Sequence, residues 1–299
     1  MHCRFCDSRA LRQSYRGLSH PTRRTHGPFD LYVCRRCGSL STWPLPSRDA
    51  LGALYGSFAS GVDTRLRELR HATPLTAWFD YVVRRTTRLG RFDHGAAFRW
   101  LDVGAGGGEL AAALARAFPK ASGVAIDWSP RPRDLDPRIA WRAADLNDDG
   151  FAMPPVQQAD LVISLSVWEH VLEPGAFVRK LLTLVAPGGM LYLVGPDVGS
   201  LAYRVMRTRW PYFLPGEHLN MPTRRGARDC LEHATAPGDS IAVGSVGLPY
   251  PPAYVLGFLG LGRLSRWTRR LPALPLPVGA LEAVCWRARS AVAGGTANQ

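Results

Sequence analysis

The sequence predicts an α/β fold, with a parallel sheet covered by helices and preceded by a small cysteine-rich unit. Short apolar runs alternate with helical patterns from about residue 96 onward, which is typical of buried parallel strands. A glycine-rich turn, GAGGG at 104–108, joins the first of these runs to an Ala-rich helix. Two Cys-x-x-Cys pairs stand near the start of the chain.

The cysteine pairs predict a metal site. They are Cys3 with Cys6 and Cys34 with Cys37. This spacing lets two thiolates converge on one Zn²⁺ from a tight turn, and two pairs complete a tetrahedral sulfur site. Gly38 suits the left-handed backbone that follows such a turn. We therefore predict a zinc ribbon over residues 1–48, with structural Zn²⁺, because four thiolates leave no open position for a substrate.

Two alternatives to four thiolates stay open at this stage. The cysteines could be unrelated or disulfide-bonded, and His20 or His26 could replace one of them. The start of the chain, Met1 to Arg4, has no apolar core typical of a signal peptide. We therefore expect a cytoplasmic, reducing environment, in which clustered thiols more often hold metal.

Residues 49–94 predict a helical connector or lid between the ribbon and the sheet domain. Apolar residues recur there at three- and four-residue spacing, and Thr73-Pro74 is typical of a helix start. The sheet domain is expected over residues 95–299. Its predicted strands are 98–103, 122–127, 139–145, 159–167 and 190–196, and its first helices are 108–118 and 176–185.

The glycine-rich turn at 104–108 predicts a ligand-binding site. A strand that turns sharply into a helix brings backbone N–H groups up to a ligand, and glycines remove the side chains that would block the approach. The pattern runs from Asp102 through Gly104 and Gly106 to Gly108. It resembles motif I of the class I S-adenosylmethionine (SAM)-dependent methyltransferases, which implies a Rossmann-like seven-stranded sheet and SAM as cofactor.

Further segments match that family in order. Asp127, which ends the second strand, resembles the acid that binds both ribose hydroxyls. Asp145 resembles the acid that meets the adenine amino group, and the neighbours Trp128 and Leu146 complete the expected SAM site. A turn role for Asp127 and a solvated loop role for Asp145 remain alternatives.

The last part of the chain also resembles this family. Residues 217–235 resemble its loop and helix before the sixth strand, 239–246 that strand, and 280–289 the seventh strand, which is antiparallel to the sixth. Residues 248–278 are then an apolar, Pro-rich insertion between strands six and seven.

Candidates for catalysis follow the fourth and fifth strands. The methyl group of SAM is already activated, so the enzyme must hold the acceptor and, for a hydroxyl or carbon acid, remove a proton. Glu169, His170 and His218 are the candidates, and His170 could instead only shape the SAM pocket. Ser166 stands where similar quinone-biosynthesis O-methyltransferases carry the first acid of a metal-binding Glu-x-x-Glu-His pattern, which argues against a Mg²⁺-assisted catechol mechanism.

The acceptor class comes from resemblance alone. A ribbon ahead of this core is similar to sugar C-methyltransferases and natural-product enzymes, although those sugar enzymes carry a further C-terminal domain for which we expect no room here. The motifs of base methylation are absent. We therefore expect O- or C-methylation of a small-molecule or glycan-like acceptor, and the sequence makes no prediction of oligomeric state.

The positive charge of the chain leaves RNA or protein open as alternative binding partners. The formal net charge is +13, but only Lys120 and Lys180 of 37 basic residues are lysines, which is typical of a GC-rich genome. Alternatively, an RNA- or protein-directed enzyme would use the ribbon arginines as a binding face. These arginines are Arg4, Arg23, Arg24, Arg35 and Arg36.

The insertion 248–278 suggests a third kind of partner. It sets apolar residues and Trp267 beside arginines, so it predicts either a lid or a contact with a membrane surface and a lipid-linked acceptor. The uncharged run that begins at Ile241 is interrupted by Pro249, Pro251 and Pro252. We therefore expect no transmembrane helix there. A noncatalytic SAM-binding protein also remains possible from the motifs alone.

Overall fold

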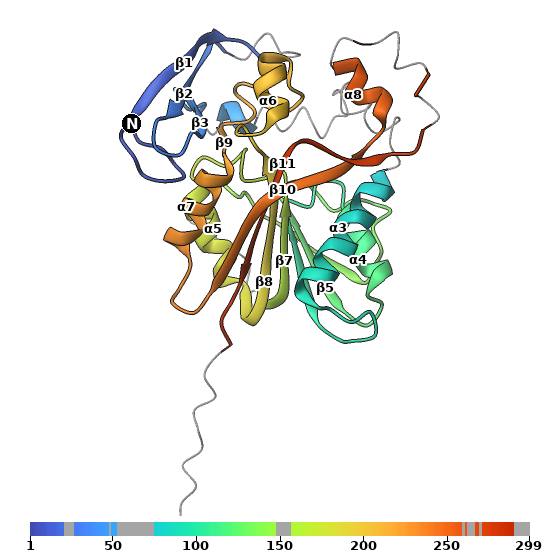
Figure 1. The fold of residues 1–299 in the computed structure, drawn as a ribbon. Coiled ribbons are helices and arrows are strands. Elements are labelled where there is room, and N and C mark those ends of the chain that lie inside the picture. The colour runs from blue at the N-terminus through green and yellow to red at the C-terminus, as the bar shows by residue number, and fades with distance from the viewer. Residues whose placement is uncertain are drawn as a thin grey trace, which may run out of the picture.

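The computed structural model describes residues 1–20, 27–47, 49–52, 75–147, 157–258, 261, 267–268 and 271–289. Within them the strands form two sheets, one of seven strands and one of four. Helices flank both faces of the large sheet, and the small sheet lies above one of its ends (Figure 1).

The large sheet confirms the predicted α/β fold. Its strands are β4 (Arg99–Val103), β5 (Ser122–Asp127), β6 (Ile139–Ala143), β7 (Ala159–Leu165), β8 (Val185–Pro196), β10 (Ser240–Tyr250) and β11 (Leu274–Trp286), in the order β10-β11-β8-β7-β4-β5-β6. β4 to β8 run parallel, whereas β11 is antiparallel to both β10 and β8. The carboxyl ends of the parallel strands therefore meet at one edge, where open α/β sheets bind ligands.

Both faces of the sheet are covered, as the apolar strands predict. Helices α3 (Leu75–Gly90) and α4 (Glu109–Ala117) pack on one face, and α5 (Pro174–Thr183) and α7 (Arg224–Ala234) on the other (Figure 1). Each face has its own apolar cluster, with Leu114 and Phe118 in the first and Phe177 and Leu231 in the second. The sheet is thus a buried layer between two cores.

The connector is only partly described. Residues 49–52 are helical, α3 begins at Leu75, and the predicted helix start Thr73-Pro74 lies outside the described residues. Arg85 of α3 forms an ion pair with the buried Glu282 of β11, and Tyr192 of β8 donates a hydrogen bond to the same carboxylate at 2.9 Å. This network fixes α3 against the antiparallel half of the sheet.

The small sheet contains one strand that the sequence did not predict. Three strands belong to the ribbon: β1 (Leu11–Leu18), β2 (Phe29–Cys34) and β3 (Leu40–Trp43). The fourth, β9 (Asn220–Met221), comes from the chain after β8 and pairs antiparallel with β3. Strand β9 is too short to produce a periodic pattern, so nothing in the sequence marks it. The ribbon is therefore completed by the sheet domain.

Three more elements lie at the carboxyl edge. They are α6 (Leu201–Met206), the 3₁₀ turn η1 (Arg207–Arg209) and α8 (Pro252–Phe258). Figure 1 shows α6 and α8 at the same end of the large sheet as the ribbon. Strands β10 and β11 continue pairing to Tyr250 and Leu274, so the connection between them is shorter than the predicted insertion 248–278. Among the described helices, none combines the length and apolar content that a bilayer crossing requires.

Candidate functional site

The glycine turn has the geometry of a ligand loop. Gly104, Gly106 and Gly108 have φ of +80°, +55° and +80°, which L-residues with side chains rarely adopt. Gly104 and Ala105 donate their N–H groups to the carbonyl of Ile126, which ties the turn to β5. A Cβ on Gly106 would meet nothing within 4 Å, so the backbone there is open to an approaching ligand.

Gly104→Ala is expected to destabilise the chain by at least about 2 kcal/mol, from the left-handed backbone and from overpacking. A Cβ at this position would lie 2.2 Å from Cγ2 of Val167. Urea unfolding measures the change. Gly244→Ala in β10, whose Cβ would meet nothing within 4 Å, is the matched control. Equal stability of the two variants would contradict the prediction.

Beside this turn lies a cleft of about 200 Å³. It is lined by Leu51, Gly52, Gly104, Asp127, Trp128, Asp145, Leu146, Asn147, Ser166, Val167, His170 and Val171. Six of the residues predicted from sequence are in this set, whereas Asp102, Gly106, Gly108, Glu169 and His218 are not among its lining residues. Sequence reasoning missed Leu51 and Gly52, which come from the connector, because no local pattern relates them to the sheet.

Asp127 is buried at the end of β5 and supports the glycine turn directly. Its Oδ2 accepts a hydrogen bond from the N–H of Gly106 at 2.8 Å, and its Oδ1 accepts from the N–H and the hydroxyl of Ser129. A carboxylate oxygen has more than one acceptor site, so these bonds leave capacity for ligand hydroxyls. Asp127 therefore has the turn role that the sequence offered as an alternative, and this role does not exclude the predicted ligand role.

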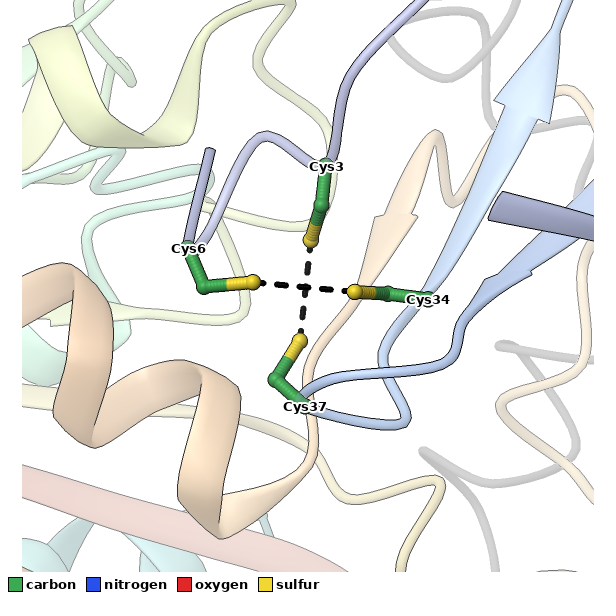
Figure 2. A group of neighbouring side chains, drawn as sticks. All are labelled: Cys3, Cys6, Cys34 and Cys37. Atoms are coloured by element: carbon green, nitrogen blue, oxygen red, sulfur yellow. Dashed lines mark hydrogen bonds between the residues drawn. The ribbon is translucent and has the colours of Figure 1, made fainter. Parts of the chain in front are cut away.

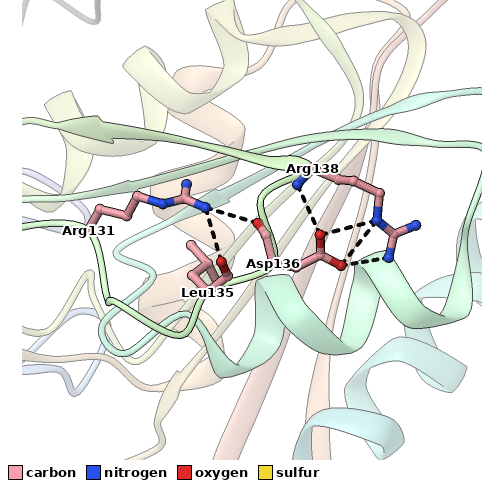
Figure 3. Close-up of polar contacts among 4 residues, drawn as sticks. All are labelled: Arg131, Leu135, Asp136 and Arg138. Atoms are coloured by element: carbon pink, nitrogen blue, oxygen red, sulfur yellow. Dashed lines mark hydrogen bonds and ion pairs between the residues drawn. The ribbon is translucent and has the colours of Figure 1, made fainter.

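The loop between β5 and β6 is fixed by arginines. Figure 3 shows Arg131 donating to the main-chain carbonyls of Leu135 and Asp136, while Arg138 forms an ion pair with the Asp136 carboxylate. Arg131 also donates to the carbonyl of Ile139. These bonds hold Leu135 under the glycine turn, where a Cβ on Gly108 would lie 2.8 Å from it.

Trp128 and Asp145 lie at the outer side of the cleft. Trp128 is 45% exposed although it is a large aromatic residue, and it lines the cleft. Asp145 is exposed, and its Oδ1 accepts the N–H of Asn147, which forms a local turn. Asn147 in turn accepts the N–H of Leu172 through its side-chain oxygen. This turn brings the side chains of Asp145, Leu146 and Asn147 to the edge of the cleft.

Asp102 is buried beneath the turn instead of in the cleft. Its side chain is 2% exposed, and its Oδ2 has no hydrogen-bond partner within the described residues. Burial, and then the charge of Asp127, raise the pKa of the Asp102 carboxyl to about 8. The folded chain thus keeps a proton on Asp102 at neutral pH.

Stability should therefore fall as pH rises between the unfolded and folded pKa values of Asp102. The folded state binds a proton that the unfolded state releases, so this group lowers the free energy of unfolding by about 1.4 kcal/mol per pH unit in that window. In Asp102→Asn this loss is absent, and the variant should gain stability relative to the parent from about pH 5 to about pH 7. Urea unfolding at several pH values tests this, with exposed Asp134→Asn as control. A pH-independent difference would contradict it.

The four ribbon cysteines converge as predicted. Figure 2 shows their sulfur atoms pointing toward one centre. Sγ of Cys3 lies 3.6 Å from Sγ of Cys37, Sγ of Cys6 lies 3.6 Å from Sγ of Cys34, and all four lie within 4.8 Å of one another. All are buried free cysteines, so the disulfide alternative is wrong. Four converging thiols are the donor set that tetrahedral zinc requires.

The turns around the cysteines suit metal binding. Gly38 has φ +80° and donates its N–H to the carbonyl of Cys34, as its position after the second pair predicted. Bonds from the Cys3 thiol lower the pKa of the Cys37 thiol, so one thiolate is already favoured. His20 does not replace a cysteine, because its Nε2 lies 2.8 Å from Oε2 of Glu217. His26 lies outside the described residues.

The ribbon holds the segment that carries His218. The N–H of Thr42 donates to the carbonyl of Leu219, and the Thr42 hydroxyl donates to the carbonyl of His218. Arg4 donates to the side-chain oxygen of Asn220 at 3.0 Å. Thr223, the N-cap of α7, donates its hydroxyl to the carbonyl of Cys37. The four ribbon cysteines and the segment that carries the predicted catalytic residue His218 are thus directly connected.

The position of Arg4 contradicts the hypothesis that it belongs to a binding face of ribbon arginines. It is 6% exposed, lies 4.5 Å from the Trp43 ring, and forms an ion pair with Glu173. It therefore stabilises the interior and does not belong to a polyanion-binding face. Arg35 and Arg36 are exposed, whereas Arg23 and Arg24 lie outside the described residues.

The predicted catalytic residues gather in one cluster at the carboxyl edge. One ligand atom from each of Glu169, His170 and His218 lies within 4.8 Å of the others. The two imidazole rings are 4.7 Å apart and nearly perpendicular. Nδ1 of His170 donates to the carbonyl of Glu217, and Nδ1 of His218 donates to the carbonyl of Tyr212. Glu169 is completely buried, and His170 borders the cleft.

Burial gives these groups unusual proton affinities. It lowers the pKa of His170, and it lowers that of His218 to about 3. It raises the pKa of Glu169 to about 8. Both imidazoles are therefore neutral, and His218 in this environment holds a proton too weakly to act as an efficient general base near pH 7.

A second cavity, of about 460 Å³, lies beyond the cluster. Its walls come from α6 and the segments before and after it, from the start of α7, and from α8, β10 and β11, and most of the side chains are apolar. Ser200, Arg224 and Ser245 supply polar groups. Tyr212 borders this cavity, and its carbonyl binds His218. The contacts from Tyr212 through His218 to His170 therefore lie between the two cavities.

Comparisons with known proteins agree on one family. A family model described as a methyltransferase domain matches residues 67–234, which is more than half of the chain. The ubiquinone biosynthesis O-methyltransferase of Aeromonas salmonicida is 27% identical over 135 residues, covering 44% of this chain and 54% of the relative. The trans-aconitate 2-methyltransferase of Methylobacterium radiotolerans is 30% identical over 112 residues, covering 36% of this chain and 42% of the relative.

The chain thus spans about half the length of these curated relatives. Among solved structures, it is similar to the plantazolicin methyltransferase BpumL in complex with a triazolic desmethylPZN analog and SAH. The TM-score is 0.55 at 18% identity, and the match covers 80% of this chain and 96% of that one. This likeness extends to the fold, a Rossmann-like sheet of seven strands.

Proposed function

The chain belongs to the methyltransferase domain family, and from that premise we propose that it transfers a methyl group from SAM to a small-molecule acceptor, at oxygen or carbon. The observation that carries the proposal is the cleft beside the glycine turn, which brings Gly104, Asp127, Trp128 and Asp145 to one rim. SAM would supply an activated methyl group there, and the chain would hold donor and acceptor in line.

The residues present fit SAM. The open backbone at Gly106 accommodates the close approach of a ligand, and the buried carboxylate of Asp127 is suited to ribose hydroxyls. The exposed ring of Trp128 suits adenine, with Asp145 and Leu146 beside it. Leu51 and Gly52 line the same cleft, which supports a lid role for the connector 49–94.

We further propose that zinc occupies the cysteine quartet and is structural. We also propose that the chain is divided into a ribbon at 1–48, which β9 completes, a connector at 49–94 and a SAM-binding core at 95–299. Because four thiolates saturate the metal, its contribution is to the position of the His218 segment and not to the methyl transfer itself.

The acceptor is proposed to bind in the cavity of about 460 Å³. A chain of contacts from Tyr212 through His218 to His170 leads from this cavity to the cleft, so the acceptor would place its reactive group at the His170 end, beside the methyl group, and its remaining part toward the cavity. Its mainly apolar lining favours an acceptor with an apolar part over a bare glycan.

Calorimetry with SAH, followed by a product search, tests this function. The full chain should release heat with SAH and with SAM, and it should add one methyl group to an acceptor from a panel of phenols, amphiphilic glycosides, lipid-linked sugars and nucleotide sugars. Mass spectrometry identifies the product. Absence of any heat with either cofactor form, on folded and zinc-loaded protein, would overturn the proposal.

A membrane-surface acceptor is the second candidate, favoured by exposed apolar side chains near this cavity. Besides Met1 and Trp128, the large apolar residues exposed in the described part of the chain are Leu201, Val205, Leu261, Trp267, Leu271 and Leu274. All six lie on α6, on the connection between β10 and β11, or at the start of β11. Such clustering is typical of surfaces that contact apolar partners.

Vesicle flotation separates this candidate from the first. The chain should float with anionic vesicles if the apolar side chains enter the interface, and Leu201→Ser with Trp267→Ser should abolish flotation. Point variants are preferred to deletion of 248–278, because both ends of that range belong to β10 and β11. If the parent chain stays with the aqueous fraction, this candidate is excluded.

A further inference from the structure

The cavity of about 460 Å³ has one charged side chain in a mainly apolar wall. Among the described residues that line it, Arg224 is the only charged one, and none is acidic. Ligand sites commonly combine apolar walls with a few polar or charged groups, which orient the ligand and select for its chemistry. The surroundings of Arg224 therefore indicate what this cavity can bind.

The ionic partner of Arg224 is buried, whereas Arg224 itself is accessible. Nε of Arg224 lies 3.5 Å from Oδ2 of Asp197, and the side chains are 55% and 0% exposed. Asp197 does not line the cavity, and its Oδ1 already accepts the N–H of Gly199. Within the described residues this ion pair is the only polar contact of the Arg224 side chain. A guanidinium has five N–H donors, so most of them are left for a ligand.

Asp197 also holds a hydroxyl at the same cavity. Its main-chain carbonyl accepts the N–H of Ser200, which is the N-cap of α6 and a lining residue. The Ser200 oxygen accepts the N–H of Tyr203, so its own O–H can still donate to a ligand. Ser200 and Arg224 thus both offer donors, which suit an anionic acceptor of hydrogen bonds.

The chain around the cavity is poor in acids. The segment from Val198 to Gly216 contains three arginines and no Asp or Glu, and the segment from Ser240 to Leu281 contains no acid either. Burial raises the pKa of the Asp197 carboxyl, whereas the charges of Arg224 and Arg204 oppose this rise. Two cations therefore act on one buried acid, and the excess positive charge favours a negatively charged ligand.

We propose that Arg224 binds the anionic group, a phosphate or a carboxylate, of an amphiphile whose apolar part occupies this cavity, and that such amphiphiles are the acceptor class. The planar guanidinium matches an oxyanion through two parallel hydrogen bonds. Tyr212 lines the same cavity, and its carbonyl binds His218, so the acceptor can extend along these contacts toward His170. The acceptor role rests on the proposed methyl transfer, whereas anion binding does not.

Titration calorimetry with two amphiphiles of equal chain length tests the site. Octyl phosphate is anionic and octyl glucoside is neutral, and both are used below the concentrations at which they form micelles. The full chain should bind octyl phosphate on the order of tenfold more tightly, because hydrogen bonds to charged groups are the stronger ones. Arg224→Gln should lose this preference. Arg224→Lys should keep part of it, since the charge remains but the planar fork does not.

Arg225→Gln is the matched control. Arg225 is the next residue of α7, is exposed and does not line the cavity, so its loss should leave the preference unchanged. Thermal melting reports whether each variant is folded. If Arg224→Gln unfolds because Asp197 loses its ionic partner, Asp197→Asn with Arg224→Gln removes both charges and should show the same loss. Equal affinity of the parent chain for the two amphiphiles, or an unchanged preference in a folded Arg224→Gln chain, would overturn the proposal.

Vesicles identify the source of the anion. Phosphatidylcholine vesicles with added phosphatidic acid present the phosphate as a lipid headgroup. Sedimentation of the chain with these vesicles, weakened in Arg224→Gln, would support a lipid headgroup as the anion. Arg224-dependent binding of octyl phosphate without such sedimentation would support a soluble amphiphile.

SAH calorimetry on the same samples keeps the two proposals apart. Arg224 does not line the cofactor cleft, so SAH affinity should stay within about twofold in Arg224→Gln. A preference for octyl phosphate without any SAH heat would overturn the proposed methyl transfer and leave the anion site standing. SAH heat without that preference would do the reverse.

Discussion

Cys37→Ser is expected to release zinc and to unfold the ribbon together with the strand that completes it. Sγ of Cys37 is one of four converging sulfurs, and a serine hydroxyl is a poor zinc ligand. Structural zinc contributes on the order of 10 kcal/mol to the folding of small zinc modules. Because Asn220 and Met221 pair with β3, the loss should extend to the segment that carries His218.

Metal analysis and hydrogen exchange measure these two effects. Zinc should fall from one equivalent to none, and the amides of β2, β3 and β9 should lose protection while β4 and β7 keep theirs. Cys285→Ser is the control, because Cys285 is equally buried but lies in β11, away from the quartet. Retention of zinc by Cys37→Ser, or of protection in β9 after zinc loss, would contradict the prediction.

Asp127→Ala is expected to weaken SAH binding by about a hundredfold. Two hydrogen bonds from ribose hydroxyls to a charged acceptor contribute about 3 kcal/mol together, which corresponds to that factor. The variant also removes the acceptor for the N–H of Gly106 and for Ser129, so the glycine turn loses its support from β5. Both effects act in the same direction.

Calorimetric titration of the variant with SAH measures the loss. Asp134→Ala removes an exposed carboxylate from the loop that follows the same strand and should leave the affinity unchanged. Thermal melting separates weakened binding from misfolding. An affinity of Asp127→Ala within threefold of the parent would mean that the ribose does not lie against this carboxylate.

The fold was predictable where its signals are local. The strands and helices from residue 99 to 196 follow from apolar runs and glycine positions, and the structure confirms them in order. Gly38 and the converging cysteines were also predictable, because a Cys-x-x-Cys turn fixes its own geometry. The cleft residues near Asp127 and Asp145 follow from their place after parallel strands.

What the sequence did not reveal depends on contacts between distant segments. Arg4 has the same local context as the exposed Arg35, yet it is buried because Asn220, Trp43 and Glu173 happen to surround it. Glu169 directly precedes the cleft residue His170, but its side chain lies inside the protein. Such outcomes depend on how distant segments pack together, and no periodicity in the sequence predicts that packing.

The pairing of β3 with β9 has a consequence for synthesis of the chain. Leu40 pairs with Met221, so the ribbon sheet cannot close until the segment around residue 221 has left the ribosome. Until then β3 presents an unpaired edge, which is a template for unwanted association. Early capture of zinc by the four cysteines, all within the first 37 residues, would shorten the search for the correct partner by holding this edge in shape while the rest emerges.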